Sequence, residues 1–172
     1  MFKWYNIQKL MYIHFVPLKT YNAPRCFWRG AYFLEEIMTR REERELAFTL
    51  IFEKIFNDEL TVAEIVDIAI DAELLESDNL FAISLAQMTD EHKEEFDSII
   101  AENAVGWRLE RLPKVSVAIL RLALCEMLYV ESIPVKVSAN EAVELAKKFG
   151  TKDDASFING LLGKVIREKD LK

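Results

Sequence analysis

The sequence predicts an all-α fold, a bundle of helices in one domain that begins near Met38. Apolar residues make up 51% of the 172 residues, which is enough for a packed core. From Thr39 onward these residues recur at the helical period of about 3.6, and no segment shows the sustained alternation of a strand. Helix-start signals also recur along this part of the chain, so helices account for the whole domain.

Two capping boxes predict where the first two helices begin. Thr39 is followed three residues later by Glu42, and Thr61 is followed in the same way by Glu64. In a capping box the hydroxyl and the carboxylate each accept a hydrogen bond from a backbone N–H that otherwise lacks a partner. The first helix is expected to end near Asn57, and the second is expected to be shorter.

The middle of the chain is predicted to hold one or two helices, a short connector and an apolar helix. Ser77 is the expected N-cap of this region, and Thr89, which precedes two acidic residues, marks either a restart or a kink. The pattern in this segment is compatible with a single helix and with two helices. Gly106 and Pro113 bracket the connector, and the segment 115–130 is apolar on nearly all sides. Such a helix is expected at the centre of a bundle.

Proline and glycine delimit the last two predicted helices. Pro134 suits a first helical turn and Gly150 suits the position just after a helix, so a helix is expected over 134–149. Thr151, ahead of two aspartates, is expected to begin a final helix that runs to about Glu168.

Two glycines lie one turn apart in that final helix. Gly160 and Gly163 each cost about 1 kcal/mol of helix propensity relative to alanine, so close contact with another helix is the favoured explanation, and a merely tolerated pair is the alternative. The run 160–165 superficially resembles a phosphate-binding loop. Its spacing is too short, Val165 stands where Ser or Thr would hold a metal, and no strand is predicted before it.

The first 37 residues differ from the rest in charge and composition. They hold five basic and two acidic residues, a charge of +3, whereas the remaining 17 basic and 27 acidic residues give −10. We consider a targeting segment, an extension that docks on the domain, and translation from upstream of the true start. A secretory signal fits poorly, because His14 and Pro17 interrupt the apolar run and no small-residue cleavage site follows.

A mis-assigned start is favoured for residues 1–37. The residues Glu35 to Ile37 can be encoded by GAGGAG-ATA, a purine-rich ribosome-binding sequence directly ahead of an ATG for Met38. If residues 1–37 are translated, they are expected to be poorly ordered or loosely docked. The predicted domain organisation is therefore an N-terminal extension, 1–37, and a helical domain, 38–172.

The composition argues against several function classes. Cys26 and Cys125 are too few and too far apart for a disulfide framework or a metal site, so a reducing cytoplasm is the simplest location. No stretch approaches the roughly 18 apolar residues that span a bilayer, so no membrane insertion is expected. With one His and one Cys in 38–172, we predict no catalytic, metal or cofactor site. Helix carboxylates are expected to pair locally, as Glu144 with Lys148.

An arginine cluster lies at the start of the first predicted helix. The net charge of −7 provides no general attraction to nucleic acid, so any such binding must be local. Arg40, Arg41 and Arg44 share the first turns, where the helix dipole makes cations slightly unfavourable. This small cost favours an anion-binding role, although a solvated charged surface is the common alternative.

A lysine cluster lies at the junction of the last two helices. Lys147, Lys148 and Lys152 surround Phe149 and Gly150. Basic side chains around an aromatic ring neutralise phosphates and stack a base, which is typical of single-stranded RNA binding. Taken alone, this cluster is also compatible with lysines that simply face solvent.

The order of motifs over most of residues 39–166 resembles the NusB family. The matching blocks are the arginine-rich opening through Arg44-Glu45-x-Ala47, the Trp107 connector, Ile119-Leu120-Arg121-Leu122-Ala123-x-x-Glu126, Ile133-Pro134-x-x-Val137, Asn140 to Lys147, Phe149-Gly150, and Phe157-Ile158-Asn159-Gly160. The resemblance implies about seven helices in two packed subdomains with the connector between them. It also implies binding of a boxA-like single-stranded element in nascent ribosomal RNA together with ribosomal protein NusE, so that RNA polymerase resists premature termination.

The same resemblance implies which residues contact RNA and where this chain departs from the family. Cys125 and Met127 replace the usual Tyr and Leu, which predicts a packing variation in the core. Ser116 lies in the stretch 114–118, where relatives often carry charges that meet NusE. The implied RNA-binding residues are Arg40, Arg41, Arg44, Lys147, Lys148, Phe149, Lys152 and Asp153.

Two other functions compete with RNA-dependent antitermination. One is a helical protein-interaction adaptor, or a homodimeric scaffold, that does not bind RNA. The other is the related RNA-binding domain at the front of ribosomal RNA cytosine methyltransferases. That reading is disfavoured because those enzymes need an α/β cofactor-binding domain, which this sequence does not contain.

Overall fold

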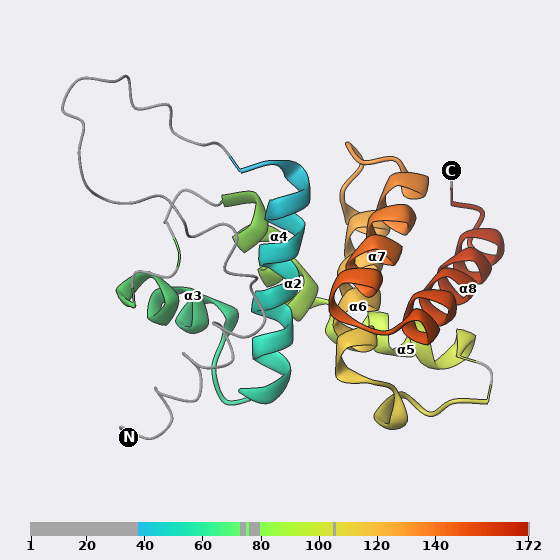
Figure 1. Cartoon of the computed structure of the whole chain (residues 1–172), viewed down its shortest axis with the longest axis horizontal. Coiled ribbons are helices and arrows are strands. Elements are labelled where there is room, and N and C mark those ends of the chain that lie inside the picture. The colour runs from blue at the N-terminus through green and yellow to red at the C-terminus, as the bar shows by residue number, and fades with distance from the viewer. Residues whose placement is uncertain (1–37, 73–74, 76–79, 105, 172) are drawn as a thin grey trace. The chain divides into compact units, whose positions relative to one another are not determined.

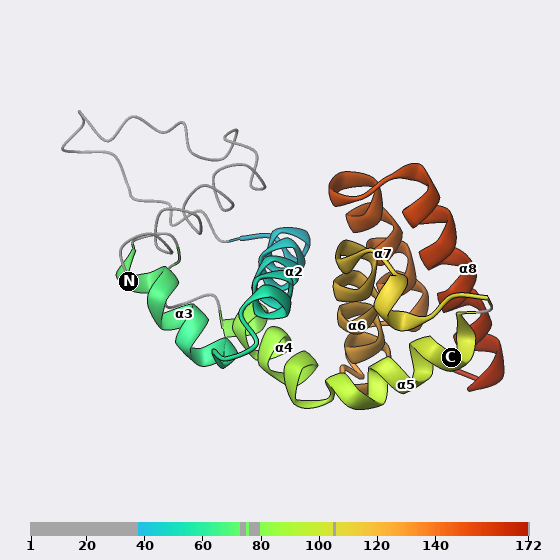
Figure 2. The same ribbon diagram turned by 90° about the horizontal axis from the view of Figure 1, so that it is seen from below.

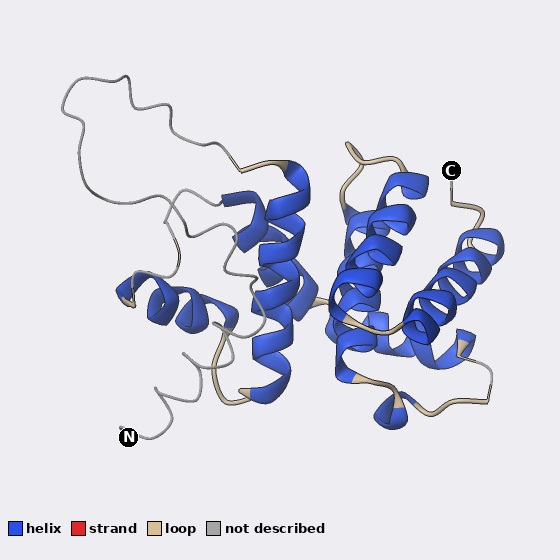
Figure 3. Ribbon diagram, viewed as in Figure 1, coloured by secondary structure: helices blue, strands red, loops and turns tan. Residues whose placement is uncertain are grey.

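A computed structural model describes residues 38–72, 75, 80–104 and 106–171. The predictions for residues 1–37 and for Ser77 lie outside the described residues. Within these ranges the chain forms seven α-helices and one short 3-10 helix and no strand, which confirms the predicted all-α class (Figure 3). No helix in the described ranges is long and apolar enough to cross a membrane. The elements are α2 (Arg40–Phe56), α3 (Val62–Asp71), α4 (Leu80–Glu91), α5 (Lys93–Asn103), η2 (Leu109–Arg111), α6 (Lys114–Tyr129), α7 (Val135–Phe149) and α8 (Lys152–Glu168).

Three predicted threonine caps are confirmed. Thr39, Thr61 and Thr151 each precede a helix, and each forms a complete capping box with the acidic residue three positions on. At the start of α2, the backbone N–H of Thr39 donates to the Glu42 carboxylate at 2.8 Å. Such a cap contributes about 1 kcal/mol to helix stability. The capping boxes therefore fix the beginnings of α2, α3 and α8 through local interactions.

The segment whose sequence is compatible with either one helix or two forms two helices. α4 ends at Glu91 and α5 begins at Lys93, with His92 between them. Thr89 does not cap the second helix. It is fully buried within α4, and its hydroxyl donates to the Leu85 carbonyl at 2.6 Å. The break therefore falls three residues after the residue that was expected to mark it.

The helices form two groups that meet at α6. Helices α2, α3 and α4 make up the first group, and α5 to α8 make up the second (Figures 1 and 2). α6 contacts α2 and α4 on one side and α5, α7 and α8 on the other. Its side chains Ile119, Leu120 and Leu124 are completely buried. The prediction that the apolar segment 115–130 lies at the centre of the bundle is confirmed.

The crossing between the two groups is not where the family resemblance implied. The segment from Trp107 to Leu112 contains η2 and joins α5 to α6, both within the second group. The chain instead passes from the first group to the second at His92, between α4 and α5 (Figure 2). The expected position of the connector between the subdomains was therefore wrong, because α5 packs on α6 and α8.

The two glycines of α8 do not mediate a close helix contact. A Cβ at Gly160 would have no atom within 4 Å, and one at Gly163 would meet only the Arg167 guanidinium of the same helix at 3.5 Å. The expectation of close packing was wrong because the buried stripe of α8 runs through other positions, among them Ile158 and Leu162. Both glycines lie off that stripe.

Steric constraints favour glycine at position 150, which is not the case at the two glycines of α8. It directly follows α7, as predicted, and α7 begins at Val135 with Pro134 as its N-cap, one residue later than predicted. A Cβ at Gly150 would lie 3.0 Å from the Ala146 carbonyl oxygen and 3.1 Å from an Asp154 carboxylate oxygen. The turn between α7 and α8 is therefore tight because residue 150 has no side chain.

Candidate nucleic-acid interface

The two predicted basic clusters lie against each other on α2 and the end of α7. The Lys148 ammonium donates to the Glu45 carboxylate at 2.5 Å. The rings of Phe48 and Phe149 pack with their centroids 4.7 Å apart. Segments that are about a hundred residues apart in the sequence therefore share one surface, which is the geometry that one RNA strand touching both clusters requires.

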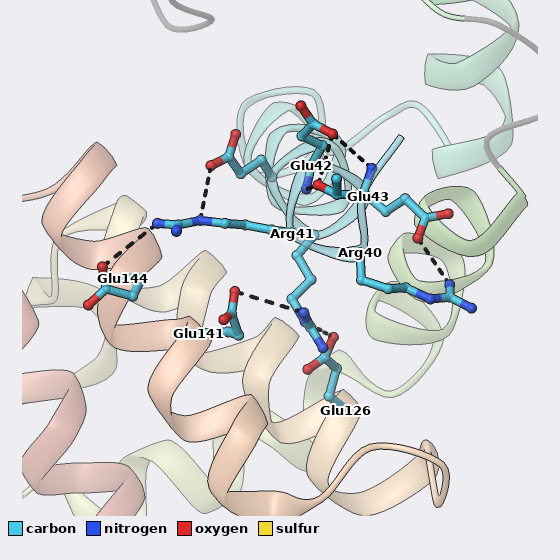
Figure 4. Close-up of polar contacts among 10 residues, drawn as sticks. Arg40, Arg41, Glu42, Glu43, Glu126, Glu141 and Glu144 are labelled. Carbon is cyan, nitrogen blue, oxygen red and sulfur yellow. Dashed lines mark hydrogen bonds and ion pairs between the residues drawn. The ribbon is translucent and has the colours of Figure 1, made fainter. Parts of the chain in front are cut away.

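Arg40 and Arg41 extend from the first turn of α2 toward different neighbours (Figure 4). The Arg40 guanidinium bonds to Glu43 at 3.0 Å and lies 4.1 Å from the ring centroid of Phe81 in α4. The Arg41 guanidinium reaches Glu144 of α7 at 3.7 Å. Their side chains are 64% and 56% exposed, so both cations are accessible to a ligand.

Arg44 takes a different position from the other two arginines. Its side chain is 8% exposed, its Nε donates to Glu126 of α6 at 2.6 Å, and its guanidinium lies 3.8 Å from Glu141 of α7. Figure 4 labels these two glutamates. It faces inward because it shares the buried stripe of α2 with Ala47 and Phe48. The expectation that Arg44 contacts RNA does not fit this position, and the residue instead joins α2 to α6 and α7.

The lysines at the end of α7 are paired with glutamates, but not as expected. Lys147 donates to Glu144 within the helix at 2.6 Å. Lys148, which was expected to pair with Glu144, instead crosses to Glu45 of α2. The hydrogen bond and the positive charge of Lys147 lower the pKa of the Glu144 carboxyl, with Arg41 adding to the effect. Glu144 therefore stays ionised at neutral pH.

The remaining predicted residues lie around the turn between α7 and α8. Phe149 is partly buried against α2, and the Lys148 ammonium lies 5.3 Å from its ring centroid. Lys152 and Asp153 are exposed in the first turn of α8. Within the described ranges, Lys152 makes no ion pair. It is therefore the most readily available cation of the predicted lysine cluster.

Ser116 holds the turn between α7 and α8 in place through a hydrogen bond. Its completely buried hydroxyl donates to the Asp154 carboxylate at 2.7 Å, which ties the first turn of α6 to the first turn of α8. Burial of the Asp154 carboxyl raises its pKa, but the hydrogen bonds from Ser116 and Thr151 outweigh burial and lower the pKa overall. Ser116 therefore faces α8, although the resemblance placed it in the stretch that meets a protein partner.

Cys125 and Met127 lie in the core, as expected, since Cys125 is fully buried and Met127 is 8% exposed. Burial raises the pKa of the Cys125 thiol to about 11, although a hydrogen bond with Thr89 acts in the opposite direction. The thiol is therefore protonated at neutral pH. Among the described residues, no three His, Cys, Asp or Glu side chains form a group that could hold a metal ion.

The sequence predicted the cations of this surface and named Glu144 as an acidic partner, although with the wrong lysine, but it missed the other acidic partners. Glu45 and Glu144 pair with the exposed cations, and Glu126 and Glu141 face the buried Arg44. One signal was present for Glu126, because a charge inside an otherwise apolar helix needs a buried partner of opposite sign. For Glu45, the i,i+4 spacing from Arg41 was a local signal, but its contact with Lys148 had none, because Lys148 comes from the other end of the domain.

Solved NusB structures share this arrangement of helices. T. maritima NusB aligns with a TM-score of 0.67 at 29% identity, over 76% of this chain and 92% of that one. A complex of antitermination factors NusB and NusE with dsRNA aligns with a TM-score of 0.64 at 24% identity, over 76% of this chain and 99% of that one, which is a likeness of fold. The fold is therefore that of the all-helical NusB class.

Sequence comparison assigns the family. The NusB family model matches residues 41–167. Transcription antitermination protein NusB from an Exiguobacterium species is 45% identical over 131 residues, which is 76% of this chain and 99% of that protein. The chain belongs to the NusB family, and the resemblance seen in its motifs is confirmed.

Proposed function

We propose that the chain is a non-enzymatic transcription antitermination factor. In this proposal it acts in the cytoplasm, binds a boxA-like single-stranded element of nascent ribosomal RNA together with NusE, and joins an antitermination complex with RNA polymerase. Family membership and the names of its relatives support the first part. A structural neighbour that contains NusB, NusE and dsRNA supports the choice of partners. The adjacency of the α2 and α7 basic clusters is the observation on which RNA binding depends.

The proposed RNA path runs from the first turn of α2 to the first turn of α8. Arg40 and Arg41 would bind phosphates at one end, and Lys147, Lys148 and Lys152 at the other. Phe149 and Asp153 line the turn between the lysines, while Arg44 holds the helices together from below. Binding through about three to five phosphates predicts a slope of log K against log salt near −2 to −3.5 for a single strand.

NusE is proposed to be needed for tight binding, because the 38–172 domain carries a charge of −10 and the cationic surface is small. The test is a fluorescence anisotropy titration of a boxA-like RNA with the full chain, with and without NusE. We expect clearly tighter binding with NusE at physiological salt. Equal affinity in the two titrations would contradict the proposed role of the partner.

Variants test the RNA surface directly. Arg40→Ala/Arg41→Ala is expected to weaken RNA binding and to make the salt slope less steep by about 1.4, because about two phosphate contacts are lost. Arg167→Ala/Lys169→Ala, which removes two exposed cations at the far end of α8, is the matched control. Unchanged RNA affinity in the α2 variant would remove this surface from the proposal.

A protein-interaction adaptor is the second candidate, and one observation favours it. The exposed arginines of α2, and Lys147 and Lys148 at the end of α7, are already paired with carboxylates. An adaptor, or a homodimeric scaffold, would bind NusE or itself without measurable affinity for RNA. Two measurements beside the RNA titration distinguish an adaptor or a homodimeric scaffold from an RNA-binding protein. They are a pull-down of NusE and the mass of the chain in solution.

A further inference from the structure

Five side chains of α2 and α7 form one alternating series of ion pairs across the proposed RNA surface. Lys148 contacts Glu45 at 2.5 Å, and Glu45 lies 4.0 Å from Arg41. Arg41 lies 3.7 Å from Glu144, which contacts Lys147 at 2.6 Å. We call these five residues the charge chain. Each glutamate contacts two cations, and Arg41 contacts both glutamates.

The charge chain leaves little unpaired positive charge on this surface. It contains three cations and two carboxylates, a net charge of +1. The side chains of Arg41, Lys147 and Glu144 are 56%, 58% and 41% exposed, so their pairs are weak and screened by salt. A phosphate group can therefore displace the glutamates, but it must compete with them to bind.

We propose that Glu45 and Glu144 are intramolecular competitors of phosphate: they occupy Arg41, Lys147 and Lys148 until an RNA displaces them. This inference rests on the proposed function, which it deepens by naming the residues that limit affinity. Phosphate charge alone then gives weak binding, and an RNA is retained only when base contacts or a partner protein add to the affinity. The lowered pKa of Glu144 keeps this competitor charged at neutral pH.

The two glutamates are not needed to hold α2 against α7. The contact of Arg44 with Glu141 at 3.8 Å and the ring contact of Phe48 with Phe149 join the same two helices beneath the surface. Removing a partly exposed carboxylate leaves no buried charge without a partner. Variants at Glu45 and Glu144 are therefore expected to fold, which a thermal melt of each variant checks.

The test measures binding of two polyanions by the full chain and its variants. The probes are a labelled boxA-like RNA and heparin, at about 0.1 M salt where the Debye length is about 10 Å. Glu45→Gln and Glu144→Gln are each expected to tighten binding of both probes roughly two- to tenfold, because each releases two ion pairs that are at least partly exposed to solvent. Glu94→Gln is the control, since Glu94 is an exposed glutamate of α5 and makes no ion pair among the described residues.

Further variants separate competition from a new contact. The alanine variants at Glu45 and Glu144 must tighten binding as the glutamine variants do, because alanine cannot donate a hydrogen bond. The salt slope should stay unchanged, since the number of bound phosphates is the same. Adding Lys147→Ala should reduce the gain from Glu144→Gln, because the released cation is then absent.

The outcomes distinguish this inference from the proposed function. Gains no larger than that of Glu94→Gln, gains with glutamine but not alanine, or gains for RNA but not heparin would overturn the competition. Tighter heparin binding with no RNA binding by any form would support the competition and overturn the proposed function. Residues 1–37 are common to all variants, so their contribution cancels in every ratio.

Discussion

Replacing Arg44 with methionine removes one partner of a buried ion pair while keeping most of the side chain's volume. The pair is short, 2.6 Å, and its members are 8% and 2% exposed. Without the guanidinium, the Glu126 carboxylate stays in the core with no opposite charge at hydrogen-bond distance. Breaking a buried pair in this way costs about 3–5 kcal/mol of unfolding free energy, which is a large part of the total of about 5–15 kcal/mol for a domain.

A double-mutant cycle isolates this interaction. Arg44→Met/Glu126→Leu removes both charges, and it is expected to recover most of the loss or to exceed the stability of the original chain by about 1–4 kcal/mol. Urea denaturation followed by circular dichroism gives the unfolding free energy of each form. The reasoning is refuted if Arg44→Met costs less than about 1 kcal/mol, or if the double variant is as unstable as the single one.

Three further predictions concern other features of the domain. Gly160→Ala should raise the unfolding free energy by about 0.5–1 kcal/mol, because a Cβ there meets no atom within 4 Å; chemical denaturation checks it. The lowered pKa of Asp154 predicts stability that is present above the unfolded pKa of about 3.9 and is lost as pH falls through the folded pKa. Ser116→Ala should flatten that acid dependence in denaturation curves. The Cys125 thiol should react with a thiol reagent only after unfolding, as peptide mass mapping would show.

Local signals were sufficient to predict most helix boundaries. Thr39, Thr61 and Thr151 cap through residues three positions away, so the relevant atoms lie within a few residues of the sequence. Thr89 shows where this reasoning fails. A threonine can cap a following helix or bond back to a carbonyl within its own helix, and burial selects the second option here. Burial depends on partners that a local pattern does not specify.

The candidate site was predictable in its cations but not in its pairing. Arg40, Arg41 and Arg44 are nearly adjacent in sequence, yet only Arg44 shares the apolar stripe of α2 and becomes buried. The helical spacing of Arg44 from the apolar residues indicated that it faces the core, although charge alone suggested the same function for all three arginines. The partners of Lys148 and Arg44 lie 103 and 82 residues away, so their pairing follows only from how the helices pack.

The central position of α6 also bears on how the chain folds during synthesis. Part of the buried surface of α2 and of α4 rests on α6, which is made only after α3 and α5. Because domains fold as units while the chain emerges, the parts of α2 and α4 that pack on α6 stay uncovered until Tyr129 has left the ribosome, although α2, α3 and α4 can already pack on one another. We expect the nascent first half to remain sensitive to protease, or bound by chaperones, until that point.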